Sequence, residues 1–241
     1  MSGHSKWATT KRQKATVDAR KGAVFTKIAN LITIVVKEKG ANPEVNFALR
    51  MAMEKARAAN MPKDNIERAV KRGTGELAGE QIEELIYEGF GPAQSQFILK
   101  CLTDSKNRTA AEIRHILSKH GGALGAVMWN FKKTGVIRIA DEEWRAKNTS
   151  LNNIELELID AGADDIKIEE EGAIIFSKPE DLQKLKQFLD LKGVKTEAAD
   201  IEYVAKEQQK LSTADAQKVQ ELINELEENE DVSGYYNNVN L

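Results

Sequence analysis

The chain has 241 residues, of which 41% are hydrophobic and 30% charged, a balance typical of a folded protein with two or three domains. A single cysteine, Cys101, excludes an intrachain disulfide and a cysteine-based zinc cluster. The longest apolar run, residues 31–36, is far shorter than the roughly 20 residues that span a bilayer. The first residues also lack the apolar core of a signal peptide, so we expect a cytoplasmic protein with no membrane partner.

Charge is distributed unevenly along the chain. Residues 1–73 hold 16 Lys and Arg against 6 Asp and Glu, a net charge of +10. The whole chain has a net charge of −3, so the remaining 19 basic and 32 acidic residues sum to −13. A basic segment joined to an acidic body indicates a polyanionic partner, most simply nucleic acid.

The first segment, residues 3–21, is polar and basic, and Asp18 is its one acidic residue. This composition predicts an arm or a short helix that does not fold by itself. Trp7, the one large apolar residue of the segment, has two interpretations. It could stack on a base, or it could pin the arm to the structure that follows.

Three amphipathic helices are predicted next. Apolar residues recur at helical spacing from residue 23 onward, and Gly40 ends this first helix. Asn42 and Pro43 have the residue types of an N-cap and a first helical position, and Pro62 opens a third helix that ends at Gly73. The expected buried side chains of the second helix are Val45, Leu49, Ala52, Met53 and Ala56. Three such helices with short links predict a small bundle.

Basic side chains of the arm and of the outer helix faces are the candidate nucleic-acid contacts. Each one taken alone could equally belong to a solvated helix face, but together they would make binding strongly salt-dependent. No helix stands out as a recognition helix by composition, which argues against a helix-turn-helix. The candidates are His4, Lys6, Trp7, Lys11, Arg12, Lys14, Arg20, Lys21, Lys27, Arg50, Arg57, Lys63, Arg68, Lys71 and Arg72.

Two α/β patterns follow a glycine-containing linker at residues 73–81. The first has strands at 85–89, 96–103 and 126–131, with a helix that begins near Asn107 or Thr109 and ends at Gly121. The second has strands at 136–140, 165–169, 173–176 and 194–205, with helices at 151–161 and after Pro179. Its β-α-β-β-α-β order predicts a ferredoxin-like unit. A last helix, capped by Ser212, and a strand at 232–239 are expected to fold back onto the first pattern.

These elements predict an α+β fold with three domains. The basic helical domain comprises residues 1–75. Residues 76–133 and 206–241 form an α/β domain, and residues 134–205 form a ferredoxin-like domain inserted in it.

Catalytic motifs are missing from the sequence. His115 and His120 are five residues apart, about 140° around a helix, so they cannot share a ligand-binding face. The glycines at 73–75 and 89–91 match turns rather than a phosphate-binding loop, and Cys101 is interpreted as a buried small hydrophobe. We therefore expect no enzyme activity, cofactor, metal or small-molecule substrate. The sequence leaves the oligomeric state open, a monomer included.

Several strings of the sequence resemble the YebC/PmpR family. They are GHSKW at 3–7, FTK at 25–27, NMPKDNIERA at 60–69, GTG at 73–75, YEGFGP at 87–92, TD at 103–104 with NRT at 107–109, and residues 125–127 followed by Trp129 and Phe131. The resemblance implies a basic helical domain and two α/β domains around a cleft, with a non-enzymatic role in gene expression. The chain departs from the family pattern at Ala23 and at Asn30–Leu31, where the family usually has Lys and Arg-Glu. These departures weaken the transfer of individual nucleic-acid contacts.

The leading hypothesis is a DNA-binding transcriptional regulator, as bacterial members of that family are described. The alternative is a translation factor that binds RNA or the ribosome, which the mitochondrial translational activators of the family suggest. A lesser alternative, from the charge pattern alone, is a scaffold whose basic segment binds acidic proteins.

Overall fold

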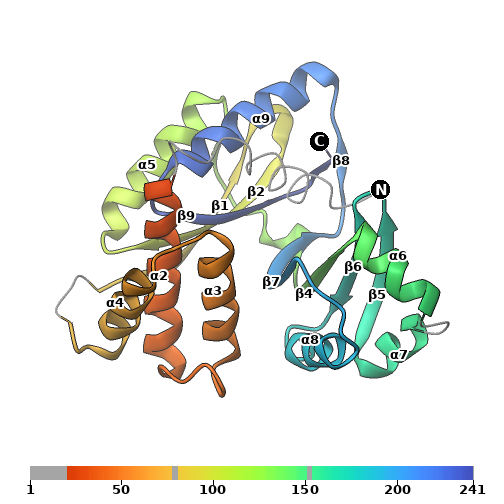
Figure 1. Ribbon diagram of the computed structural model, residues 1–241. Coiled ribbons are helices and arrows are strands. Elements are labelled where there is room, and N and C mark those ends of the chain that lie inside the picture. Colours follow the sequence, from red (N-terminus) through yellow and green to blue (C-terminus); the bar gives the residue numbers. More distant parts are fainter. Residues whose placement is uncertain (1–20, 78–80, 151–153, 241) are drawn as a thin grey trace. The chain divides into compact units, whose positions relative to one another are not determined.

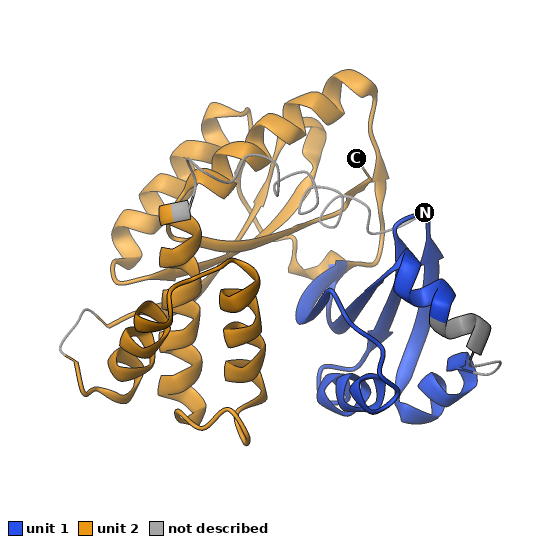
Figure 2. Cartoon of the chain, in the orientation of Figure 1, with its two compact units in different colours: residues 1, 131–204 blue, residues 2–130, 205–241 orange. Residues whose placement is uncertain are grey.

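The computed structural model in Figure 1 describes residues 21–77, 81–150 and 154–240. These residues form two compact units, which Figure 2 distinguishes by colour. One unit consists of residues 131–204, and the other combines the preceding residues with residues from 205 onward. Helices and antiparallel sheets occur in both, which confirms the predicted α+β class. The exact division into three domains stays a prediction.

The basic part of the chain folds into three helices, α2 (Lys21–Lys39), α3 (Phe47–Ala58) and α4 (Lys63–Thr74). Their core contains the fully buried side chains of Ile32, Leu49 and Ala56, in agreement with the predicted helical spacing. Val45, which was expected in this core, is 76% exposed. It lies in the turn that precedes α3, outside the helical stripe.

The cap of α3 is Asn46, so the prediction that Asn42 and Pro43 begin this helix is wrong. The Asn46 side chain is completely buried, and its Oδ1 accepts the Leu49 N–H at 3.0 Å. Its Nδ2 donates to the carbonyls of Val35, at 2.9 Å, and Gly40, at 2.7 Å. Asn46 therefore provides hydrogen-bond partners both for carbonyls at the end of α2 and for an N–H at the start of α3. A helix that began four residues earlier would contain Asn46 and prevent this capping.

Gly73 lies inside α4, and the helix ends at Gly75, whose φ of 80° is left-handed. The prediction that Gly73 ends the helix is therefore wrong. A Cβ at Gly73 would lie 2.7 Å from both the Thr33 carbonyl oxygen and the Val36 Cβ of α2. Gly73 is thus required by the close approach of α2 and α4 rather than by a turn.

The α/β part of the same unit is built on one sheet in the order β3-β1-β2-β9. Its strands are β1 (Glu83–Phe90), β2 (Gln96–Thr103), β3 (Ala123–Leu124) and β9 (Val232–Asn237). Helices α5 (Lys106–Lys119) and α9 (Thr213–Glu228) cover one face (Figure 1). Alternate residues of β2, namely Phe97, Leu99 and Cys101, pack against them. Because β9 pairs with β2, the prediction that the last helix and strand fold back is confirmed.

Two local predictions in this part are wrong. The α5 helix begins at Lys106, and Thr109 is buried in its first turn instead of capping it. Residues 126–130 form a loop with a short 3-10 helix, η2 (Met128–Asn130), instead of a strand. The Glu88 carboxylate accepts the N–H groups of Val127 and Met128, each at 2.7 Å, so these donors are unavailable for a sheet. A second turn, η1 (Pro92–Gln94), connects β1 to β2.

The unit of residues 131–204 has the ferredoxin-like topology. Its sheet order is β5-β6-β4-β7, which numbered along the chain is the 4-1-3-2 arrangement of a split β-α-β-β-α-β unit. The strands are β4 (Phe131–Ala140), β5 (Ala163–Glu169), β6 (Gly172–Ser177) and β7 (Ala198–Ala205). The helices are α6 (Asp141–Ser150), α7 (Ile154–Ala161) and α8 (Leu182–Leu191), of which α6 was not predicted.

Helix α9 is joined to the end of α5 by an ionic cluster. The Glu225 carboxylate accepts a hydrogen bond from Lys119 Nζ at 2.9 Å and lies 2.7 Å from His120 Nε2. Hydrogen bonds from Lys119 and then His120 hold the pKa of Glu225 below its ordinary value. The ionised carboxylate is therefore the form that stabilises the fold.

We expect Gly73→Ala to lower the free energy of unfolding by about 1–3 kcal/mol, because the added methyl overpacks the contact between α2 and α4. Gly22→Ala is the matched control, since a Cβ at Gly22 of α2 meets no atom of the described residues within 4 Å. It should leave stability unchanged or raise it by up to about 1 kcal/mol. Urea unfolding followed by circular dichroism measures both. Equal stabilities of the two variants would contradict the close-packing role of Gly73.

We expect Glu225→Gln to lower the melting temperature by a few degrees near neutral pH. A depressed folded-state pKa contributes stability above the ordinary pKa of a glutamate, and this contribution disappears as the pH falls through the folded value. The difference between wild type and variant should therefore vanish in strong acid. Thermal unfolding across a pH series tests this, and a difference that persists in acid would contradict it.

Candidate nucleic-acid interface

Four of the predicted basic contacts are exposed on the outer faces of the bundle. Arg57 lies in the last turn of α3, and Lys63, Arg68 and Lys71 lie along α4. Lys63 Nζ is 3.4 Å from a carboxylate oxygen of Glu67, but both side chains are more than half exposed. Such a surface ion pair is weak, so it leaves Lys63 accessible to a polyanion.

Three further predicted contacts, Lys27, Arg50 and Arg72, are partly buried. Lys27 Nζ donates to the Glu227 carbonyl at the end of α9, at 2.6 Å, which attaches α2 to the α/β part. The Arg50 guanidinium lies 5.4 Å from the centroid of the Phe47 ring. Arg72 lines a pocket. The structure thus assigns to Lys27 a contact between the bundle and α9.

The remaining predicted contacts lie outside the residues whose side chains the structure describes, and they stay predictions. These are His4, Lys6, Trp7, Lys11, Arg12, Lys14, Arg20 and Lys21.

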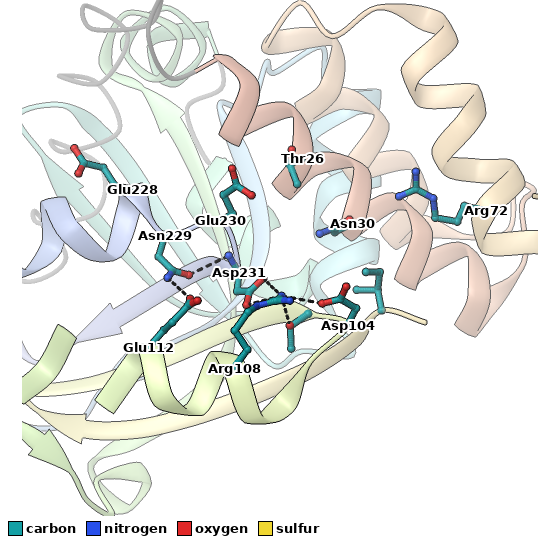
Figure 3. Close-up of a pocket in the computed structure, with 12 residues that line it drawn as sticks. Thr26, Asn30, Arg72, Asp104, Arg108, Glu112, Glu228, Asn229, Glu230 and Asp231 are labelled. Atoms are coloured by element: carbon teal, nitrogen blue, oxygen red, sulfur yellow. Dashed lines mark hydrogen bonds and ion pairs between the residues drawn. The ribbon is translucent and has the colours of Figure 1, made fainter. Parts of the chain in front are cut away.

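A pocket of about 890 Å³ is lined by residues of both the bundle and the α/β part (Figure 3). Thr26 and Asn30 of α2 form one wall, and residues at the end of β2, the start of α5 and the turn between α9 and β9 form the other. Its charged lining residues are Asp104, Glu112, Glu228, Glu230 and Asp231, with Arg72 and Arg108. Five carboxylates against two guanidinium groups make this pocket unfavourable for phosphate.

Hydrogen bonds order the floor of the pocket. Arg108 Nη2 donates to Asp104 Oδ1 at 2.8 Å and to both carboxylate oxygens of Asp231 at 3.2 Å. The Thr109 hydroxyl donates to Asp231 Oδ2 at 2.6 Å. The hydrogen bonds to Asp104 and Asp231 raise the pKa of Arg108, so its charge is fixed. Sequence reasoning missed this site, because Asp231 is more than 120 residues from its partners in the chain.

Cys101 lies in the core next to this network, completely buried. Burial, followed by the negative charge of Asp231, raises the pKa of the Cys101 thiol to about 12. The interpretation of Cys101 as a buried small hydrophobe is confirmed.

Among the described residues, no group of three or more His, Cys, Asp or Glu is placed to hold a metal ion.

In the same part of the chain, no helix combines the length and apolarity that crossing a membrane requires.

The fold and its charges define an α+β protein with a basic helical bundle and an acidic α/β body. A family model described as the TACO1/YebC protein N-terminal domain matches residues 5–76, and one described as the TACO1/YebC second and third domain matches residues 82–239. The chain therefore belongs to the TACO1/YebC family, which confirms the resemblance found in the sequence.

Relatives of known sequence match over the whole chain. A probable transcriptional regulatory protein of Thermoanaerobacter pseudethanolicus is 46% identical over 246 residues, with 100% of this chain and 98% of the relative covered. One of Thermotoga maritima is 45% identical, with 100% and 94% covered. The crystal structure of a conserved hypothetical protein from Aquifex aeolicus matches with a TM-score of 0.81 and 41% identity, covering 94% of this chain and 93% of that one. The names of the relatives support a regulatory role at the level of the family.

We expect Cys101 to react with a disulfide reagent only when the protein unfolds. With a thiol pKa of about 12, its thiolate fraction near pH 8 is roughly a thousand times below that of an unperturbed cysteine. Absorbance measurements with Ellman's reagent, in buffer and in guanidinium chloride, test this. Rapid stoichiometric reaction of the native protein would contradict the burial of the thiol.

Proposed function

We propose that this protein is a cytoplasmic, non-enzymatic regulator of gene expression that binds nucleic acid through its basic helical bundle and the arm that precedes it. The observation that carries the proposal is the exposure of Arg57, Lys63, Arg68 and Lys71 in a segment with a net charge of +10. DNA recognition in transcription is the first candidate, which the names of the relatives support.

The charge distribution favours binding on the outer faces of the helices. Exposed Lys and Arg can neutralise phosphates and release counterions, which supplies salt-dependent affinity. The carboxylates of the pocket repel phosphate, so a polyanion gains most where it contacts the bundle on the side away from them. Lys27 would then contribute by holding α2 against the end of α9, and Arg72 by adding positive charge near the pocket. Neither would contact phosphate directly.

RNA or the ribosome is the second candidate partner. The exposed face of α4 mixes Lys63, Arg68 and Lys71 with Asp64 and Glu67. Such a face suits contacts to a phosphate backbone better than reading of base edges in a major groove, where bidentate Arg, Asn and Gln dominate. Binding without sequence preference would favour this candidate, whereas a footprint confined to one promoter would favour transcription.

We expect the combined substitution of Arg57, Lys63, Arg68 and Lys71 by Glu to weaken nucleic-acid binding and to reduce the salt slope. Each lost phosphate contact lowers the slope of log K against log salt by about one. Fluorescence anisotropy with duplex DNA and with RNA, over a range of salt concentrations, measures both quantities. Replacing Lys11, Arg12, Lys14, Arg20 and Lys21 by Glu tests the arm separately.

The matched control replaces exposed lysines elsewhere, Lys178, Lys184, Lys195 and Lys210, by Glu, and so changes the net charge equally. It should have a much smaller effect, since only the general charge of the molecule changes. An unchanged affinity and slope in both the bundle and the arm variants would overturn the proposed interface. Tight binding of acidic proteins instead of nucleic acid would favour the scaffold alternative.

A further inference from the structure

A large aromatic side chain is exposed on the loop that follows β3. Trp129 is 61% exposed, whereas Trp144 of the other unit is 3% exposed and belongs to a core. An indole ring offers a partner a large, rigid apolar surface. Packing among the described residues leaves most of the Trp129 side chain accessible to such a partner.

The backbone that carries Trp129 is held from both sides. Before Trp129 in the chain, the Glu88 carboxylate accepts the N–H groups of Val127 and Met128, each at 2.7 Å. On the other side, Lys206 Nζ donates to the Trp129 carbonyl at 2.7 Å.

Asn130, the residue after Trp129, is buried and adds a second set of bonds. Its Nδ2 donates to Gln96 Oε1 at 2.7 Å and to the Glu207 carbonyl at 3.0 Å, and its Oδ1 accepts the Glu207 N–H at 2.9 Å. The exposed ring is thus presented by an ordered loop whose neighbours are fixed in the body of the unit. Little conformational entropy remains to be lost when a partner binds.

A strained turn lies at the same end of the sheet. Ala93 and Gln94 are consecutive non-glycine residues with φ of 54° and 60°, and both are exposed. Each such conformation is unfavourable and persists only where the surroundings enforce it. Here Gln209 Nε2 donates to the Ala93 carbonyl at 2.8 Å, and the neighbouring Gln96 contacts Asn130. The hydrogen bond between Gln96 and Asn130 therefore links the strand that follows the turn to the loop that carries Trp129.

We propose that Trp129 is a stacking platform for an unpaired base of a single-stranded nucleic acid. An exposed aromatic ring stacks on any base, and duplex bases are inaccessible to it because they already stack on one another. Lys206 is an exposed residue whose ammonium group lies at the Trp129 carbonyl, where its charge suits the neighbouring phosphate. The inference rests on the proposed nucleic-acid binding. It adds that the ligand has an unpaired base, which the phosphate contacts of the bundle do not detect.

The test compares wild type with Trp129→Ala and Trp129→Phe on four oligonucleotides of equal length. These are a single strand with bases, in DNA and RNA forms, an abasic single strand with the same phosphates, and a blunt DNA duplex. We expect Trp129→Ala to weaken binding of the base-containing strand by about 5- to 150-fold, the range measured for one stacked base. Binding of the abasic strand should not change. Trp129→Phe should retain much of the affinity, since its ring still stacks.

A spectroscopic arm reports on the indole itself. In a protein with Trp7 and Trp144 replaced by Phe, the base-containing strand should quench the fluorescence of Trp129, and the abasic strand should not. Leu191→Ala removes another exposed apolar side chain, 89% exposed in the other unit, and should leave every affinity unchanged. Circular dichroism of each variant separates a loss of folding from a loss of binding.

The outcomes distinguish the two proposals. If wild type binds none of the oligonucleotides, the proposed function fails. If wild type binds them and Trp129→Ala changes nothing, or weakens the base-containing and abasic strands equally, the stacking role is overturned while nucleic-acid binding stands. A greater loss for RNA than for DNA, with the abasic strand unaffected, supports the stacking role and identifies the preferred sugar.

Discussion

The pairing of β9 with β2 is the contact on which the larger unit depends. It brings the end of the chain back to a strand more than 120 residues earlier, and it fixes α9 on the same face as α5. Asp231 stands at its start. The Asp231 carbonyl accepts the Leu102 N–H at 2.8 Å, and its carboxylate binds Arg108 and Thr109 of α5. One residue therefore joins the returning strand to both the sheet and a helix.

The same turn also sets the electrostatics of the pocket. Asp231 and the glutamates before it lie opposite α2, whose Lys27 bonds to the Glu227 carbonyl at the end of α9. The bundle is thus attached to the body beside the acidic lining of the pocket. The exposed Arg57, Lys63, Arg68 and Lys71 lie instead on α3 and α4. With the proposed interface, this arrangement would separate a surface that repels phosphate from one that attracts it, although the net charge of the chain is close to zero.

The sequence alone was sufficient for features that depend on local periodicity. The helical stripe through Ile32 and the ferredoxin-like strand order are examples, because spacing determines which face is buried. Prediction from the sequence failed where the role of a residue depends on a contact with a distant segment of the chain. The sequence suggests that Gly73 ends a helix, but its role depends on the close approach of the Thr33 carbonyl. Asn46 is recognisable as a cap only once the carbonyls at the end of α2 are known to accept its side-chain N–H groups.

The candidate site divides in the same way. Net charge located a basic segment, but it could not separate Arg68 and Lys71, which are exposed, from Lys27, which is bonded to another helix. The sequence pattern predicts a strand where the loop of Trp129 lies, because it does not reveal that the Glu88 carboxylate binds two N–H groups of this loop. Tertiary hydrogen bonds decided both cases, and such bonds leave no periodic signal.

The proposed phosphate contacts lie on the bundle, which packs beside one end of the sheet, and Trp129 lies at the other end. The end of β2 at Thr103 lines the pocket beside the bundle, whereas its start at Gln96 contacts the loop of Trp129. The eight residues of β2 separate these ends by roughly 25 Å. Contacts so far apart contribute nearly independently to binding. Phosphate contacts weaken with salt, whereas base stacking depends on it little, so salt would change the balance between them. A partner bound at low salt mainly by its backbone would, at higher salt, be retained by its unpaired bases.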